Sequence, residues 1–86
     1  MKFTETTAER MGDPNRFVPM QILRKAIESG LERPDPQGTE AMMYYTKMFR
    51  NGSPYNLEVL YDKATNIVLH FKYTIEAIGP LEAIPK

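Results

Sequence analysis

Residues 41–74 read AMMYYTKMFRNGSPYNLEVLYDKATNIVLHFKYT, and this stretch decides the fold because it contains three runs of alternating apolar and polar residues. Each run is rich in Tyr, Val, Ile, Phe and Thr, which suit a half-buried, pleated strand. Turn-forming residues separate the runs, so consecutive strands can fold back on one another. The sequence therefore predicts a three-stranded antiparallel meander, with strands over about 41–49, 54–62 and 66–74.

The two turns set the expected register of these strands. Asn51 and Gly52 tolerate the positive φ angles of a type I′ turn, so a two-residue hairpin is expected between the first two strands. The second loop, residues 62–66, ends on Asn66 in a left-handed conformation. The pairs predicted across the hairpin are Met48/Tyr55, Lys47/Asn56, Thr46/Leu57, Tyr45/Glu58 and Tyr44/Val59. The pairs predicted across the second loop are Tyr61/Ile67, Val59/Leu69, Leu57/Phe71 and Tyr55/Tyr73.

Alternation sorts the side chains of this sheet into two faces. The apolar face is expected to form the core and carries Tyr44, Met48, Tyr55, Leu57, Val59, Tyr61, Ile67, Leu69, Phe71 and Tyr73. The other face carries Tyr45, Glu58 and His70 and, one pleat away, Lys47, Asn56 and Lys72. In this register the only histidine of the chain stands directly opposite a carboxylate, with cations on either side. No packing requirement explains these polar rows.

The N-terminal half predicts a short helix and a longer one. Thr6 and Glu9 have the spacing of a capping box, so a helix is expected over about 7–11. A second helix is expected over about 19–29, with Gly30 in a left-handed position just past its end. Its apolar stripe is expected to cover the apolar sheet face and contains Met20, Ile22, Leu23, Ala26 and Ile27.

The segments that flank the sheet carry breaker residues. Residues 31–38 contain two prolines and a glycine, which predict a crossover loop from helix to sheet. Residues 75–86 either add a short edge strand or lie across the end of the sheet. The expected fold is thus one α+β domain over residues 1–86, with the helices on one face of a three- to four-stranded antiparallel sheet.

Composition limits the possible functions. The chain has 86 residues and no cysteine, which excludes disulfides and zinc–thiolate sites. It contains no membrane-spanning run and no N-terminal secretion signal, so export is expected only within a larger polypeptide or by a signal-independent route. Eleven basic and eleven acidic residues argue against broad, nonspecific binding to nucleic acid. The sequence motifs of phosphate-binding loops, dinucleotide sites and nucleophile elbows are absent.

The polar sheet face suits metal-independent RNA cleavage. This reaction needs a base for the 2′-hydroxyl, an acid for the leaving 5′-oxygen and cations for the phosphorane. Glu58 is the expected base and His70 the acid, because a neighbouring carboxylate favours the imidazolium. Tyr45 is expected to stack on a base or to donate its hydroxyl, as a further catalytic group. Lys72 is expected to be a catalytic group as well, because it can hold the phosphate. The expected phosphate or RNA contacts are Lys47, Asn56, Arg10, Arg16 and Thr74, with no metal or cofactor.

Each of these features also has a purely structural interpretation. A Glu–His pair across two strands is commonly a surface stabiliser that contributes ~0.2–1 kcal/mol. Lysines on an exposed strand commonly protect solubility or a sheet edge. The residues alone therefore leave catalysis and surface stabilisation open.

A family resemblance favours catalysis. It is carried, in order along nearly the whole chain, by RFVPMQILRKAIESG, PDPQGT, YYTKMFRNG, YNLEVLYD and TNIVLHFKY. These segments resemble the C-terminal toxin modules of bacterial polymorphic and contact-dependent inhibition systems, which have the barnase/EndoU/colicin/RelE-like (BECR) fold. The resemblance implies a metal-independent endoribonuclease, often a tRNase, that acts in the target-cell cytoplasm and is neutralised by a cognate immunity protein. It also implies that His70 and Lys72 lie on the active-site strand and that Glu58 parallels the carboxylate base.

The chain departs from that family pattern at two places. Such modules commonly have a histidine in the first helix, where this chain has Thr6 and Thr7. They also carry basic residues after the last strand, where this chain has Ile75 and Glu76. Either the chain is a variant that uses fewer catalytic groups, or it has lost activity. The second explanation corresponds to the alternative function, a non-catalytic or inactivated module that binds a protein partner through its open sheet face or an edge strand.

Overall fold

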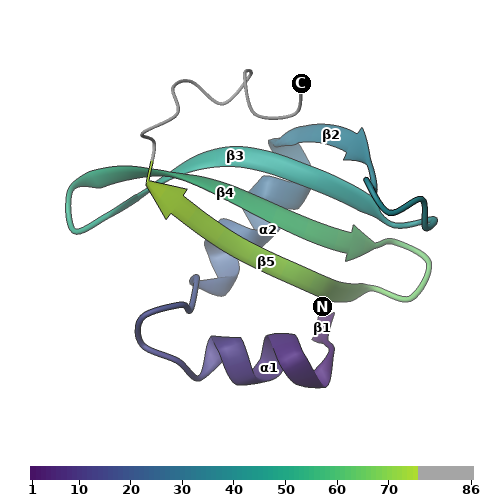
Figure 1. Cartoon of the computed structure of the whole chain (residues 1–86), viewed down its shortest axis with the longest axis horizontal. Helices are drawn as coiled ribbons and strands as arrows, with labels where there is room; N and C mark the ends of the chain where they lie inside the picture. The colour runs from purple at the N-terminus through teal and green to yellow at the C-terminus, as the bar shows by residue number, and fades with distance from the viewer. Residues whose placement is uncertain (76–86) are drawn as a thin grey trace.

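The computed structural model describes residues 1–75, which form two helices and a five-stranded mixed sheet (Figure 1). The elements in chain order are β1 (Lys2–Phe3), α1 (Glu5–Met11), α2 (Met20–Ser29), β2 (Leu31–Pro34), β3 (Met42–Arg50), β4 (Ser53–Asp62) and β5 (Ile67–Ile75). The strand order is β1-β5-β4-β3-β2, in which β1 is parallel to β5 and the other neighbours are antiparallel. The predicted α+β class is correct, but the sheet is not the three- to four-stranded antiparallel meander expected.

Both edge strands of the sheet lie outside the predicted strands. The two residues of β1 pair with Ile67 and Val68 of β5. β2 occupies part of the expected crossover loop and pairs with β3, with Leu31 opposite Tyr45. Neither segment is long enough to show a strand period, so pairing with the rest of the sheet determines its conformation. The segment 75–86, for which an edge strand was one of two expectations, lies outside the described residues except for Ile75, which ends β5.

The hairpin between β3 and β4 has the predicted register. Arg50 pairs with Ser53, and the two residues between them, Asn51 and Gly52, have φ angles of 51° and 80°. These are the positive values that a type I′ turn requires. The predicted pairs are confirmed for Met48/Tyr55, Lys47/Asn56, Thr46/Leu57, Tyr45/Glu58 and Tyr44/Val59.

The predicted register between β4 and β5 is wrong. The connecting loop is one residue shorter than expected, because Asp62 pairs with Ile67. A β-bulge then shifts the ladder once more: Leu60 pairs with His70 and Tyr61 with Val68, which leaves Leu69 as the extra residue. The observed pairs Val59/Phe71, Leu57/Tyr73 and Tyr55/Ile75 replace the predicted ones. Asn66 has the predicted left-handed conformation, with a φ of 59°.

The two shifts cancel in their effect on side-chain direction beyond the bulge. Phe71 therefore stays on the apolar face and His70 on the opposite one, since a two-residue shift preserves the pleat. Before the bulge only one shift applies, so Val68 is the fully buried residue. Ile67 and Leu69, which were predicted for the core, are only half-buried.

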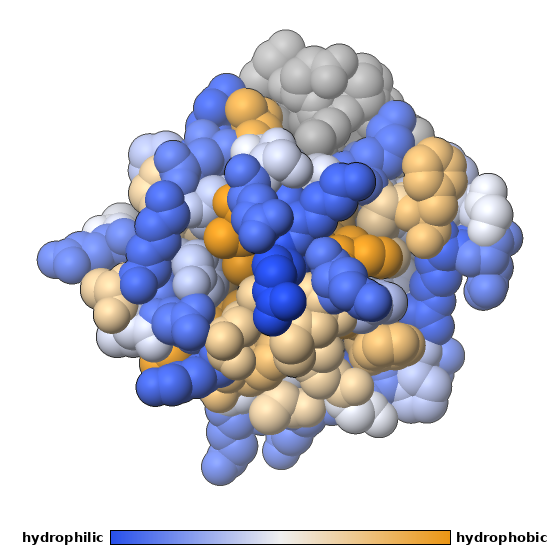
Figure 2. All heavy atoms as spheres, turned by 180° about the vertical axis from the view of Figure 1, so that it is seen from behind, coloured by the Kyte–Doolittle hydropathy of each residue, from blue (hydrophilic) through white to orange (hydrophobic). Residues whose placement is uncertain are grey.

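The helices cover one face and one edge of the sheet. α2 crosses behind the sheet in Figure 1, and α1 lies beside β5. Leu23 and Ala26 of α2 are fully buried, as the apolar stripe predicts, whereas Met20 is 39% exposed. Figure 2 views this helix side and shows apolar side chains gathered between hydrophilic ones. The buried core consists of Val18, Leu23, Ala26, Met48, Leu57, Val59, Val68 and Phe71.

The ends of the helices differ from their predictions in two details. Thr4, and not Thr6, caps α1, because its hydroxyl accepts a 3.2 Å hydrogen bond from the backbone N–H of Thr7. Gly30 follows α2 with a φ of −73°, so it is not left-handed. A Cβ at Gly30 would instead collide with the carbonyl oxygens of Ala26 and Tyr45. Glycine is required there because the backbone of residue 30 lies against both the last turn of α2 and the neighbouring strand β3.

Candidate functional site

Glu58 of β4 and His70 of β5 form the centre of the candidate site. The prediction that they stand directly opposite each other is wrong, because Glu58 is opposite Lys72 and His70 is opposite Leu60. The pair is nevertheless made along the diagonal, where Nε2 of His70 lies 2.9 Å from Oε2 of Glu58. The two side chains are 34% and 25% exposed, so the pair is partly open to solvent on the face away from α2.

The other ring nitrogen of His70 faces α1. Nη1 of Arg10 lies 3.5 Å from Nδ1 of His70, and the same atom donates a 2.6 Å hydrogen bond to the carbonyl oxygen of Phe71. The guanidinium also lies over the Phe71 ring, 5.9 Å from its centroid. Because a guanidinium only donates, this arrangement assigns Nδ1 as an acceptor and Nε2 as the nitrogen that donates to Glu58.

The surroundings of Glu58 keep it ionised. The hydrogen bond from His70 lowers the pKa of Glu58, partial burial opposes this effect, and the positive charge of Lys72 reinforces it. The net result is a pKa below the ordinary value of 4.5. An ionised carboxylate beside an imidazole fixes the orientation of the ring and stabilises a positive charge that develops on it.

A pocket of about 250 Å³, which we call the cationic pocket, opens on the Arg10 side of His70. It is lined by Arg10, Asn15, Arg16, His70, Lys72 and Tyr73, which come from α1, the α1–α2 loop and β5. Its described lining contains three permanent cations and no carboxylate. Arg16 forms an ion pair with Asp13 at 3.7 Å, but its side chain is 66% exposed. Such a set of donors suits a phosphate group.

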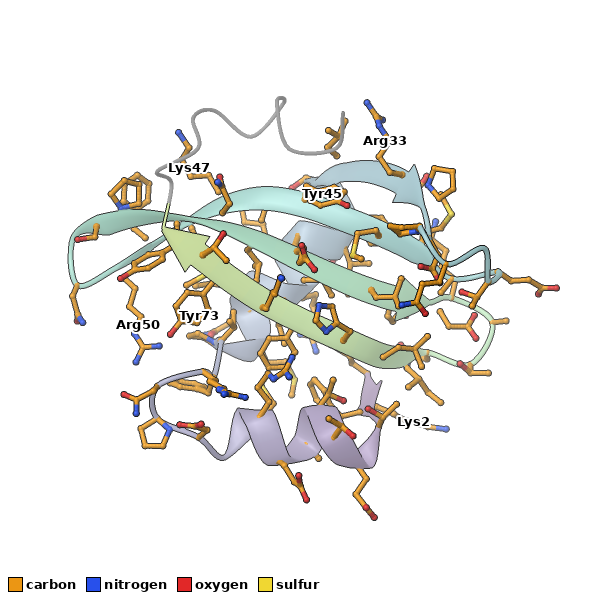
Figure 3. The ribbon with its side chains drawn as sticks, viewed as in Figure 1. Lys2, Arg33, Tyr45, Lys47, Arg50 and Tyr73 are labelled. Carbon is orange, nitrogen blue, oxygen red and sulfur yellow. The ribbon has the colours of Figure 1, made fainter. Side chains whose placement is uncertain are left out.

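Hydrogen bonds attach the α1–α2 loop to the sheet. The hydroxyl of Tyr73 donates a 2.6 Å hydrogen bond to the carbonyl oxygen of Asn15. Arg50 donates to the hydroxyl of Tyr73 and to the carbonyl oxygen of Pro14. Figure 3 shows the side chains of Arg50 and Tyr73 next to each other above this loop. These contacts hold the segment that carries Arg16 against the sheet.

Sequence reasoning did not identify Arg50 or Tyr73 as part of the site. The partners of these residues are distant in the chain: Arg50 and Pro14 are separated by 36 residues, and Tyr73 and Asn15 by 58. No local pattern reports a contact across such separations. Tyr73 was predicted only for the core, although it also lines the cationic pocket.

A second pocket, of about 440 Å³, lies on the Glu58 side of His70, and we call it the loop pocket. It is lined by Asp35, Pro36, Gln37, Met43, Glu58, Leu60, Leu69 and His70. The carboxylate of Asp35 orders the loop, because it accepts hydrogen bonds from the hydroxyl of Thr39 and from the backbone N–H of Gln37. These bonds lower the pKa of Asp35. His70 lines both pockets.

The remaining predicted contacts lie away from His70. Tyr45 faces Glu58 in the ladder but is only 8% exposed, so its ring offers little surface for stacking. Asn56 is 5% exposed, and its amide has no hydrogen-bond partner among the described residues. Lys47 and Thr74 are exposed opposite Asn56 on the two neighbouring strands, and neither lines the cationic pocket or the loop pocket. In Figure 3, Lys47 projects outward beyond β3.

Residues 1–75 contain neither a metal-binding cluster nor a membrane-spanning helix. Within this range, no group of three or more His, Cys, Asp or Glu side chains is arranged to hold a metal ion. Neither α1 nor α2 has the length and apolar character needed to cross a membrane.

Comparisons with known proteins assign no family to the chain. No protein-family model matches it, and neither the curated proteins nor the solved structures give a significant match. The resemblance to bacterial toxin modules therefore stays a prediction, and the functional argument depends on the geometry around His70.

Proposed function

We propose that this chain is a small, metal-independent endoribonuclease that cleaves RNA by attack of the 2′-hydroxyl on the adjacent phosphate. The observation that carries the proposal is the position of His70. One of its ring nitrogens is 2.9 Å from a carboxylate, and the other faces the cationic pocket. These are the acid–base and charge-stabilising groups that transesterification needs.

In the proposed mechanism, the scissile phosphate binds in the cationic pocket between Arg10, Arg16 and Lys72. Arg10 turns from Nδ1 of His70 toward the phosphate, because a charge-assisted hydrogen bond is stronger than its 3.5 Å contact with a neutral imidazole. Nδ1 of His70 then takes up a proton from solvent, so that the ring becomes an imidazolium whose Nδ1–H faces the substrate.

The chemical step exchanges one phosphorus–oxygen bond for another. The 2′-oxygen attacks phosphorus while Glu58, which is ionised, accepts the hydroxyl proton. The bond from phosphorus to the 5′-oxygen breaks, and His70 gives its proton to that oxygen. The products are a 2′,3′-cyclic phosphate and a free 5′-hydroxyl. The cations of the pocket stabilise the additional negative charge of the phosphorane.

The proposed biological setting follows from the resemblance. The chain would be a bacterial toxin module, delivered as part of a larger polypeptide, that cuts RNA such as tRNA in the target-cell cytoplasm. A cognate immunity protein would neutralise it by covering the Glu58–His70 pair, which is only partly exposed and therefore easily shielded.

A second candidate function is protein binding without catalysis. The observation in its favour is Phe49, a large apolar side chain that is 64% exposed on β3. Exposed aromatic residues are enriched at protein interfaces. This function predicts a tight partner complex and intact RNA.

Incubation of the purified chain with total RNA in the presence of a chelator tests the ribonuclease proposal. We expect fragments with 2′,3′-cyclic phosphate ends, and we expect His70→Ala to abolish them while the circular dichroism spectrum stays unchanged. Lys72→Ala and Lys25→Ala are a matched pair, since Lys25 is exposed on α2, away from the pocket. The first should lower the cleavage rate about 10²-fold, and the second should not. Intact RNA, or equal rates for the two lysine variants, would contradict the proposal.

A further inference from the structure

The bulge in β5 directs Leu69 to the same side of the sheet as His70. Neighbouring residues of a regular strand point to opposite faces, yet Leu69 and His70 both line the loop pocket. Leu60, which is opposite His70 in the ladder, and the buried Met43 extend this apolar wall. The wall exists because of an irregularity in the ladder, and bulges are over-represented next to active sites.

The two pockets that meet at His70 differ in charge. The cationic pocket has Arg10, Arg16 and Lys72, whereas the described lining of the loop pocket has two carboxylates and neither Lys nor Arg. A phosphate in the loop pocket would be repelled by Asp35 and Glu58. Carboxylate oxygens accept hydrogen bonds, so the pocket suits an uncharged group with N–H donors and an apolar face.

A nucleotide has an anionic part and an uncharged part, which match the different charges of the two pockets. Its phosphate is anionic, and its base is flat, uncharged and equipped with N–H groups at its edge. The loop pocket, at about 440 Å³, has the volume typical of a small-molecule site. We infer that the loop pocket binds the nucleobase next to the scissile phosphate, with the base packed on Leu60 and Leu69 and its edge toward the Asp35–Gln37 loop. This inference rests on the proposed ribonuclease function and adds the orientation of the substrate to it.

Nuclear magnetic resonance of the full ¹⁵N-labelled chain tests the inference with two probes. Inorganic phosphate should shift signals of the cationic pocket, at Arg10, Arg16 and Lys72. Nucleoside 3′-monophosphates of the four bases should shift the same signals and, for at least one base, those of Leu60, Leu69 and Gln37 as well.

Two variants in the apolar wall separate base binding from phosphate binding. Leu69→Gln and Leu60→Gln, which add no charge, should each weaken binding of that nucleotide about tenfold, the size expected for loss of a base contact. Both should leave binding of inorganic phosphate unchanged. Phe49→Ala, which removes an exposed side chain outside both pockets, should alter neither affinity.

The outcomes distinguish this inference from the ribonuclease proposal. Nucleotide shifts confined to the cationic pocket, or an equal loss of phosphate and nucleotide affinity in both leucine variants, would overturn the base pocket. RNA cleavage without shifts at Leu60 and Leu69 would overturn it too, while supporting the ribonuclease. Base-dependent shifts in a chain that leaves RNA intact would support the pocket and contradict the ribonuclease.

Discussion

Replacement of Glu58 by glutamine tests the pair at the centre of the site through the stability of the fold. The hydrogen bond from Nε2 of His70 to Oε2 of Glu58 is 2.9 Å long and joins side chains that are 34% and 25% exposed. A hydrogen bond to a charged group contributes ~1.5–3 kcal/mol, and an exposed ion pair only ~0.2–1 kcal/mol. The intermediate exposure predicts that Glu58→Gln lowers the free energy of unfolding by about 1 kcal/mol near pH 6.

This difference should depend on pH because folding lowers the pKa of Glu58, chiefly through the hydrogen bond from His70. A carboxyl group with a lowered pKa stabilises the folded state above its unfolded pKa, ordinarily 4.5. That contribution is lost as the pH falls through the folded pKa, where both states bind the proton. The difference between wild type and Glu58→Gln should therefore shrink steadily as the pH falls below about 4.5.

Urea denaturation of both proteins, followed by circular dichroism at several pH values, measures the effect. Glu40→Gln makes the same chemical change at an exposed position before β3 and should alter stability by less than about 0.5 kcal/mol. A difference for Glu58→Gln that is independent of pH would refute the argument that His70 stabilises the ionised carboxylate. So would the absence of any difference near pH 6.

Three further predictions follow from individual contacts. Arg10→Met should lower RNA cleavage about 10²-fold, because it removes a cation from the cationic pocket, where the scissile phosphate is proposed to bind; a wild-type rate in the cleavage assay would contradict this. Burial, together with a 2.6 Å hydrogen bond to Glu32, raises the pKa of Tyr44 to about 12, so part of the stability is lost as the pH rises from 10 toward that value. Denaturation curves of Tyr44→Phe should lack that part of the alkaline loss. Gly30→Ala should lower the free energy of unfolding by about 1–3 kcal/mol through collision with two carbonyl oxygens, and an unchanged urea midpoint would argue against the close approach.

Local sequence signals were sufficient where neighbouring residues determine the conformation. Asn51-Gly52 defines its own turn, and the turn sets the β3–β4 register, so the opposition of Tyr45 and Glu58 was predicted correctly. No local sequence signal marks the bulge at Leu69, because the apolar residues around it fit both the predicted and the observed β4–β5 register. β1 was missed because two residues show no period, and β2 because its proline and charges resemble a loop.

The candidate site was predictable only in part for the same reason. The prediction that Glu58 and His70 share one face is correct although the predicted register is wrong. The shorter loop and the bulge each shift the register by one residue, and together they leave the side-chain direction unchanged. The contact of Arg10 with His70 spans 60 residues and depends on where α1 docks, which sequence spacing does not report. Tyr45 was expected to be available to a base, yet it is buried, since alternation indicates the face of a residue and not what covers that face.

The parallel pairing of β1 with β5, between Lys2 and Ile67, also has a consequence for the order of folding. Pairing of β1 with β5 closes the whole chain segment between Lys2 and Ile67 into a loop, and this costs conformational entropy that only the contacts formed afterwards offset. We therefore expect the hairpins β3–β4 and β4–β5 to form first. α1 follows directly after β1, and Arg10 therefore arrives at His70 only when the N-terminus has docked. A chain with its hairpins formed and its N-terminus still loose holds the Glu58–His70 pair without the arginine. If the proposed ribonuclease function is correct, such a chain should not cleave RNA until folding is complete.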